Sequence, residues 1–268
     1  MTRYVDTIGI VGLGFVGNAV WQSYKDSFFN SIIIDPAKGW YATYQDLIQC
    51  SAVFVCVPSP QGDDGSCDTS ILESVLKELK AVDYTGVIIS KVTAPPDVYS
   101  RLQKEYPNLV HAPEFLTAAN AIADYQNGKF AFIGGAVSAY RNEAERIIKI
   151  GQTQLESVRH CSIQEASMVK YILNCYLATK VIFMNEVSKL AETMGCDWNV
   201  LQGLIECDNR VGNTHMQVPG PDGQFGFGGM CFPKDTSAML KFAELAEQQM
   251  NVLDAAVKKN TLLRLSND

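Results

Sequence analysis

The sequence lacks long apolar runs, paired cysteines and an excess of positive charge. No stretch approaches the roughly 18 apolar residues of a membrane-spanning helix, and the N-terminus carries no basic, apolar leader. The eight cysteines stand far apart without a CxxC pair, which disfavours a metal site or a disulfide framework. We therefore expect a cytoplasmic protein with no bound metal and no membrane contact.

Acidic residues outnumber basic ones. Twenty-two Lys and Arg against 29 Asp and Glu give a net charge of −7. Nucleic-acid binding requires a basic face, so nucleic acid is not an expected partner. The chain is otherwise ordinary for a globular protein, with 268 residues, 47% apolar and 19% charged, which is long enough for two domains.

A glycine-rich turn follows the first apolar strand. The strand Thr7–Val11 leads directly into Gly12-Leu13-Gly14-Phe15-Val16-Gly17, and a helical pattern continues from Asn18. In this context the first glycine turns the chain, the second lets backbone approach a pyrophosphate, and the third lets helix and strand pack closely. The motif, including Phe15 and Val16, predicts a dinucleotide site at the helix N-terminus.

An acidic residue ends the next predicted strand. Asp35 follows the strand Ser31–Ile34 and lies 23 residues beyond Gly12. There a carboxylate can accept hydrogen bonds from the adenosine ribose and repel a 2′-phosphate. This favours NAD over NADP as cofactor, although Lys38 nearby leaves NADP open.

Strand and helix patterns alternate through the first 150 residues, which is typical of a doubly wound parallel sheet. We predict an α/β fold, with a Rossmann-type NAD-binding domain over residues 1–160 and a helical domain with a long central helix over residues 161–268. The further predicted strands are 52–57, 86–90, 108–111 and 130–133, and the predicted helices are 69–81, 97–105 and 138–150.

Three loops leave these strands at the carboxyl edge of the sheet, where ligands bind. Pro58 and Ser59 follow the third strand, and Thr93 stands before two prolines after the fourth. Glu114 follows the next strand among apolar residues, which can raise a carboxyl pKa toward the range of a general base. A plain strand exit, a turn hydroxyl and a solvated acid are the respective alternatives.

A long helix is predicted in the second half. Ser162 and Glu165 fit a capping box, helical spacing runs to Met194, and Gly195 fits a C-terminal cap. Within it Lys170 and Asn174 stand four apart, on one side of the helix. They are interpreted either as oxyanion-stabilising donors in a cleft or as a solvated stripe.

A thiol follows a run of glycines near the end of the chain. Gly226-Phe227-Gly228-Gly229-Met230 precedes Cys231, and Lys234 and Asp235 come soon after. A reactive cysteine needs access and a nearby positive charge, and this run provides both. The alternative is that this run is only a tight turn before a helix. A last helical region is predicted from about Thr236 to the end.

Taken together, these motifs resemble those of the UDP-glucose/GDP-mannose dehydrogenase family. The resemblance runs from Ile8 to the C-terminus and also includes Pro113–Leu116 and Asp208–Gly212. It implies NAD-dependent four-electron oxidation of a nucleotide sugar, with UDP-glucose to UDP-glucuronate, the UDP-glucose 6-dehydrogenase reaction, as the nearest activity. A role in polysaccharide biosynthesis is implied as well.

The resemblance implies a role for each matching residue. Cys231 would carry a thiohemiacetal and then a thioester, while Lys170 and Asn174 would stabilise oxyanion charge. Asp235 and Thr93 would place water, and Glu114 would act as base in hydrolysis. Lys234 would lie on the cofactor side with the dinucleotide residues named above. Substrate contacts are implied for Phe115, Leu116, Lys170, Asn174, Phe225 and Gly228, and for Arg210, which would reach a substrate in the neighbouring subunit.

The resemblance also carries expectations about partners. A homodimer through the long helix is implied. Family members usually continue into a second α/β domain that holds much of the nucleotide, whereas this sequence ends at Asp268. The expectation is that this C-terminal domain is lacking or is supplied by a separate chain. Val92, Asp97 and Ala118 depart from the Ser, Gly and acid that the family often has.

Two other functions stay open. One is a non-catalytic or split-enzyme NAD-binding module that kept the cofactor fold. The other is a two-electron 3-hydroxyacid-type dehydrogenase, because such enzymes also place a long helix with Lys and Asn four apart after a dinucleotide domain. Alcohol-to-ketone oxidation needs no thiol, so the role of Cys231 separates these alternatives.

Overall fold

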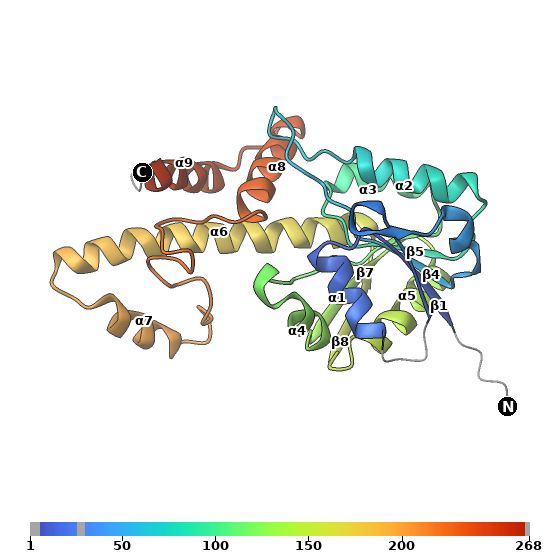
Figure 1. The fold of residues 1–268 in the computed structure, drawn as a ribbon. Coiled ribbons are helices and arrows are strands. Elements are labelled where there is room, and N and C mark those ends of the chain that lie inside the picture. The colour runs from blue at the N-terminus through green and yellow to red at the C-terminus, as the bar shows by residue number, and fades with distance from the viewer. Residues whose placement is uncertain (1–5, 26–29, 266–268) are drawn as a thin grey trace. The chain divides into compact units, whose positions relative to one another are not determined.

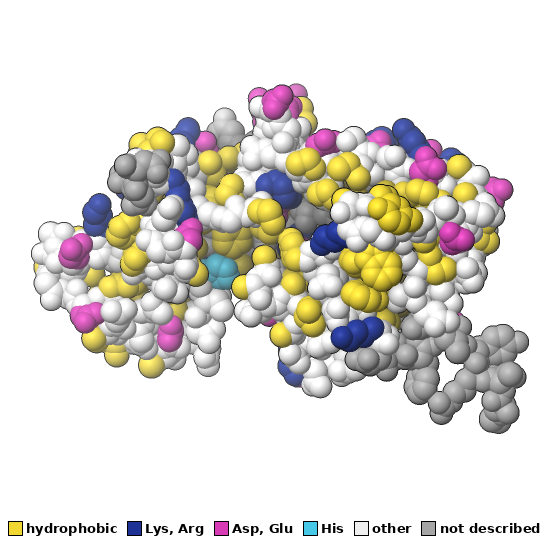
Figure 2. All heavy atoms as spheres, viewed as in Figure 1, with side chains coloured by type: hydrophobic (Ala, Val, Ile, Leu, Met, Phe, Trp, Pro, Cys, Tyr) yellow, Lys and Arg dark blue, Asp and Glu magenta, His cyan; other side chains and the backbone are white. Residues whose placement is uncertain are grey.

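The computed structural model describes residues 6–25 and 30–265. The chain forms two compact units, one comprising residues 1–60 and 68–170 and the other residues 61–67 and 171–268. No helix in the described segments is both long and apolar enough to cross a membrane. In the view of Figure 2, the Lys and Arg side chains of these segments are scattered among acidic and uncharged ones.

The first unit is built around one sheet, to which the described residues contribute eight strands in the order β3-β2-β1-β4-β5-β6-β7-β8. The strand order reverses between β1 and β4, which confirms the predicted doubly wound α/β fold and marks the point where such sheets bind ligands. The strands are β1 (Thr7–Val11), β2 (Asn30–Asp35), β3 (Trp40–Tyr41), β4 (Ala52–Val55), β5 (Val87–Ser90), β6 (Leu109–His111), β7 (Phe130–Gly134) and β8 (Ser157–Cys161).

Helices cover both faces of this sheet (Figure 1). One apolar core joins the sheet to α1 (Phe15–Tyr24), α4 (Ala121–Gln126) and α5 (Ser138–Gly151), and a second core joins it to α2 (Ser70–Ala81) and α3 (Pro96–Glu105). Central strands such as β4 are buried along their whole length, because both of their faces meet helices. Such strands are read in the sequence as continuous apolar runs.

The sheet is parallel, as predicted, except at two places. β3 pairs antiparallel with β2, and β7 pairs antiparallel with β6. Neither β3 nor β8 was predicted. β3 has only two residues, and β8 includes the exposed polar residues Arg159 and His160, so neither shows the apolar pattern of a core strand.

The predicted long helix is α6 (Ile163–Thr193), which begins in the first unit and continues into the second. Its capping box is confirmed, because the Ser162 N–H donates to the Glu165 carboxylate at 2.7 Å and the Glu165 N–H donates to Ser162 Oγ at 3.2 Å. Gly195 has a φ of +72°, as a left-handed C-terminal cap requires.

The second unit contains the rest of α6, then α7 (Trp198–Glu206), α8 (Phe232–Leu245) and α9 (Asn251–Leu265). The helical region predicted from about Thr236 to the end consists of two separate helices, α8 and α9. α8 starts earlier, since Pro233 fits a first helical turn, and it ends before Glu247, which has a left-handed φ of +56°. Ile182, Phe227 and Ala256 form an apolar core among these segments.

Candidate functional site

The glycines of the β1–α1 turn have three different surroundings. Gly12 has a φ of +89°, and an added Cβ would lie 2.8 Å from the Cys56 carbonyl oxygen. A Cβ at Gly17 would lie 2.0 Å from the Gly12 oxygen, so only glycine allows α1 to pack this closely on β1. A Cβ at Gly14 would meet nothing within 4 Å. The space above Gly14, at the N-terminus of α1, therefore fits a dinucleotide pyrophosphate.

Asp35 and Lys38 hold this turn from the end of β2. The Leu13 N–H donates to Asp35 Oδ2 at 2.6 Å, and Lys38 Nζ donates to the Leu13 carbonyl oxygen. Both side chains predicted to face the cofactor thus contact the backbone between Gly12 and Gly14. Phe15 and Val16, the first residues of α1, are half-buried.

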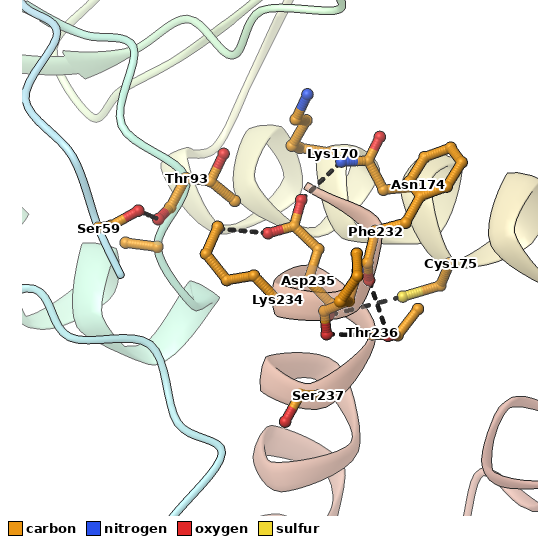
Figure 3. A network of polar contacts seen from close by, with 12 residues as sticks. Ser59, Thr93, Lys170, Asn174, Cys175, Phe232, Lys234, Asp235, Thr236 and Ser237 are labelled. Atoms are coloured by element: carbon orange, nitrogen blue, oxygen red, sulfur yellow. Dashed lines mark hydrogen bonds and ion pairs between the residues drawn. The ribbon is translucent and has the colours of Figure 1, made fainter. Parts of the chain in front are cut away.

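Two further predicted cofactor loops lie along the same edge of the sheet. β1, β4 and β5 are neighbours and run parallel, so the loops that follow them leave the sheet together. Ser59, after β4, donates from Oγ to the Thr93 carbonyl oxygen, after β5, at 2.7 Å (Figure 3). Pro58 is exposed beside them. The structure therefore brings the Pro58, Ser59 and Thr93 loops together.

Glu114 is buried and paired, so it is not a solvated acid. Lys170 Nζ donates to the Glu114 backbone oxygen at 2.6 Å and lies 3.2 Å from Glu114 Oε1. The Leu116 N–H donates to the other carboxylate oxygen at 2.8 Å, and the Lys170 ammonium lies 5.3 Å from the centre of the Phe115 ring. The Pro-Glu-Phe-Leu segment and the first turns of α6 therefore form one polar cluster in the first unit.

Asn174 and Asp235 form a second buried cluster, in the second unit. Asn174 Nδ2 donates to Asp235 Oδ2 at 2.6 Å, and the Lys234 ammonium pairs with the other oxygen of the same carboxylate (Figure 3). Asn174 and Asp235 are 7% and 1% exposed, which excludes the solvated stripe for Asn174. Asp235 also lies in the first turn of α8, where the helix dipole stabilises negative charge.

Cys231 is the residue at the N-terminal cap of α8 and is half-buried. A helix N-terminus lowers the free energy of a thiolate relative to the thiol, which favours nucleophilic attack. The loop before it is held in place by two asparagines. Asn185 of α6 accepts from the Gly226 N–H at 2.9 Å, and Asn260 of α9 bonds to both backbone groups of Phe227.

The remaining predicted substrate residues differ in exposure. The Arg210 side chain is 89% exposed and pairs with Asp208 of its own loop, while Phe225 is 42% exposed. A Cβ at Gly228 would lie 2.7 Å from the Arg264 guanidinium, so a side chain there would push against α9. All three residues belong to the second unit.

Two buried lysines were missed by the sequence analysis. Lys180 of α6 donates to the backbone oxygens of Val211, Gly212 and Thr214, and so fixes the segment that follows Arg210. Lys91 directly follows β5, and burial lowers its pKa to about 8. The sequence did contain a signal for both. Lys91 directly follows a buried strand and Lys180 lies inside a largely apolar helix, and a charged residue in either position indicates a buried partner.

Known proteins of one family are similar to most of this chain. The NAD binding domain model of the UDP-glucose/GDP-mannose dehydrogenase family matches residues 40–151, and the model of the central domain of that family matches residues 164–262. A UDP-glucose 6-dehydrogenase of Bacillus subtilis is 30% identical over 80% of this chain and 49% of its own length. One from Pseudomonas aeruginosa is 29% identical over 81% of this chain and 49% of its own length. The chain thus spans about half the length of these curated relatives.

Solved structures show the same fold. A UDP-glucose dehydrogenase from Pyrobaculum islandicum is similar with a TM-score of 0.80 and 23% identity, covering 98% of this chain and 70% of that one. A 3-hydroxyisobutyrate dehydrogenase from Mycobacterium tuberculosis is similar with a TM-score of 0.75 and 17% identity, covering 95% of this chain and 92% of that one. At these identities the likeness concerns the fold alone.

Proposed function

Since the chain belongs to the UDP-glucose/GDP-mannose dehydrogenase family, we propose that it takes part in NAD-dependent oxidation of a nucleotide sugar to an acid. The match to the family's NAD binding domain confirms NAD as the cofactor predicted from the glycine turn. UDP-glucose is the proposed substrate, because several similar curated proteins are named UDP-glucose 6-dehydrogenase. The observation that carries the proposal is Cys231 at the N-terminus of α8, four residues before the buried Asp235.

NAD supplies the hydride acceptor for the two oxidation steps. Under the proposal, the Cys231 thiolate adds to the aldehyde carbon formed in the first step and gives a thiohemiacetal. Oxidation of that carbon leaves a thioester on Cys231. Water then attacks the thioester carbon while Glu114 takes a proton from the water. The C–S bond breaks, the acid leaves and the thiolate is restored.

Other residues of the two polar clusters have supporting roles in this proposal. Lys170 and Asn174 stabilise the oxyanion, a role that suits an ammonium and an amide N–H as donors. Asp235 and Thr93 place the attacking water, and Lys234 contacts the cofactor. The hydrogen bond from Asn174 to Asp235 supports a fixed amide orientation before substrate binds.

Substrate contacts are assigned on exposure and resemblance. We propose that Phe115, Leu116, Phe225 and the backbone at Gly228 contact the nucleotide sugar, and that Arg210 reaches a phosphate in a neighbouring subunit. The exposure of Arg210 and Phe225 leaves both available to a ligand. Arg is also the side chain best suited to paired phosphate contacts.

We propose a homodimer formed through α6. Ile172, Tyr176, Phe183 and Leu190 lie at spacings of four, seven and seven residues along this helix and are 50% to 63% exposed. Apolar residues at such spacing form a stripe that another helix can cover. Light scattering should show a dimer that Phe183→Glu with Leu190→Glu converts to monomer, and an unchanged mass of that variant would refute this interface.

The reaction is tested with purified protein, NAD and UDP-glucose, and GDP-mannose in parallel. NADH formation and a Cys231-linked acyl adduct in the mass spectrum are the expected results, and Glu114→Gln should accumulate the adduct. Cys231→Ala should abolish acid formation, whereas Cys196→Ala, at an exposed cysteine elsewhere, should not. Turnover that survives Cys231→Ala would refute the thioester route and indicate a two-electron oxidation.

A further inference from the structure

A small cavity of about 110 Å³ lies beside Glu114 in the first unit. This volume is enough for several water molecules. The cavity extends from buried side chains to exposed ones, so it connects the interior to the surface. Its buried lining includes Lys91, Pro113, Glu114 and Gln152, and its exposed rim includes Lys129 and Phe130.

The buried lining carries polar groups that call for hydrogen-bond partners. Lys91 and Gln152 are 6% and 9% exposed, and Gln152 Oε1 is fully buried without a hydrogen-bond partner among the described residues. The Lys91 ammonium lies 5.5 Å from the centre of the Tyr125 ring. Buried polar groups are almost always satisfied by protein or by ordered water. Donors from Lys91 and acceptors on Gln152 and Glu114 suit water held between them.

The charges around Lys91 are mixed. Burial lowers its pKa to about 8, and this is partly offset by attraction to Cys56 and Glu114. The ring of His111 in β6 stacks on Tyr99, and the charges of Lys91 and Lys170 act on it. Tyr125 of α4 covers the Lys91 amine. Asp124 and Lys129 stand at the outer lining. Burial also lowers the pKa of His111 to about 3, so His111 stays neutral near pH 8 and takes up no proton.

Lys170 is not suited to accept a proton from Glu114. Its Nζ already donates to the backbone oxygen and to the carboxylate of Glu114, at 2.6 and 3.2 Å, so its N–H groups are directed at that residue. Lys91 makes no direct ion pair with Glu114 in the described structure, although both line the cavity. A proton that moves between Glu114 and Lys91 must therefore cross the cavity.

We infer that neutral Lys91 accepts, through water in this cavity, the proton that Glu114 takes up during thioester hydrolysis. The inference rests on the proposed function. Glu114 gains a proton from the attacking water as the C–O bond forms and the C–S bond breaks. The carboxylic acid passes this proton to cavity water, which passes a proton to the Lys91 amine. The resulting ammonium releases the proton to solvent at the exposed rim of the cavity, and Glu114 is again a carboxylate.

Single-turnover decay of the Cys231 adduct tests this step. In the unsubstituted protein the decay rate should rise as pH increases through about 8, because the neutral amine then becomes populated. Lys91→Met removes the acceptor and Lys91→Arg keeps the charge but stays protonated. Both should slow decay at pH 8.5 by about tenfold or more, given the usual size of acid–base effects. Lys129→Met, on the exposed rim of the same cavity, should stay within about twofold.

The outcomes separate this inference from the proposed function. Absence of any adduct, even in Glu114→Gln, would refute the proposed function. Adduct that accumulates in Glu114→Gln but decays at the normal rate in Lys91→Met would refute only the role of Lys91. Normal decay in Lys91→Arg would show that charge is needed rather than proton uptake.

A measurement without substrate examines the same lysine. NMR of protein with ¹³C-labelled lysine side chains should show one ε-carbon that titrates with a midpoint near pH 8. That signal should vanish in Lys91→Met and persist in Lys129→Met, while the rest of each spectrum reports that the variant is folded. The absence of any lysine titrating near this pH would overturn the inference.

Discussion

Removing either partner of the Lys170–Glu114 pair should destabilise the first unit strongly, and the effects of the two single substitutions should not add. The two side chains are only 5% and 8% exposed, and Lys170 Nζ donates to both the backbone oxygen and the carboxylate of Glu114. Removal of one partner leaves a buried charge without compensation, which typically costs about 3–5 kcal/mol. Lys170→Met should therefore lower the free energy of unfolding by about that amount.

A double-mutant cycle isolates the interaction. Glu114→Gln leaves the ammonium an amide oxygen and the backbone oxygen, so its cost should be smaller, about 1–3 kcal/mol. In Lys170→Met with Glu114→Gln neither charge remains, and the double variant should be more stable than the sum predicts by about 2 kcal/mol. Urea unfolding followed by circular dichroism measures all four proteins.

An exposed pair in the same unit serves as the control. Lys149 and Glu145 pair at 2.5 Å on α5, but the lysine side chain is 53% exposed. Lys149→Met should change stability by less than about 1 kcal/mol, as surface ion pairs usually do. The reasoning is refuted if Lys170→Met costs no more than Lys149→Met, or if the Lys170 and Glu114 effects add within about 0.5 kcal/mol.

Two further predictions concern the glycine turn and pH. Gly17→Ala should destabilise the protein by about 1–3 kcal/mol or more in urea unfolding, because its Cβ would lie 2.0 Å from the Gly12 oxygen. Gly14→Ala, whose Cβ meets nothing, should leave stability unchanged but weaken NAD binding about tenfold in calorimetry; normal NAD affinity would contradict the placement of the pyrophosphate. Burial lowers the pKa of His111 to about 3, below its value near 6.5 in an unfolded chain. Its contribution to stability is therefore complete above pH 6.5 and is lost progressively as pH falls toward 3, by about 2 kcal/mol between pH 6.5 and 5. His111→Phe should remove that part of the pH dependence of urea unfolding, and an equal slope in both proteins would contradict it.

Local patterns in the sequence predicted most of the secondary structure. The Gly12–Gly17 turn, the capping box of Ser162 with Glu165 and the cap at Gly195 each depend on residues within about six positions. Such features follow from backbone geometry and nearby hydrogen bonds, so they can be recognised without the fold. The same holds for the buried strands β1, β4 and β5, whose apolar runs are continuous.

Elements with little apolar signal could not be predicted this way. β8 has exposed Arg159 and His160 and is held by pairing with β7, which lies more than twenty residues earlier. The break between α8 and α9 occurs in a polar segment with neither Gly nor Pro, where Glu247 adopts a left-handed conformation. In both cases tertiary context decided against local propensity.

The sequence by itself determined the fold class, the cofactor turn and the membership of the family, because these depend on local motifs in a fixed order. Only the tertiary structure showed that Glu114 pairs with Lys170, 56 residues away, and that Asn174 pairs with Asp235, 61 residues away. It also showed Lys91 buried beside a cavity. Side-chain partners across such distances depend on how the chain closes on itself, which no short window of sequence records.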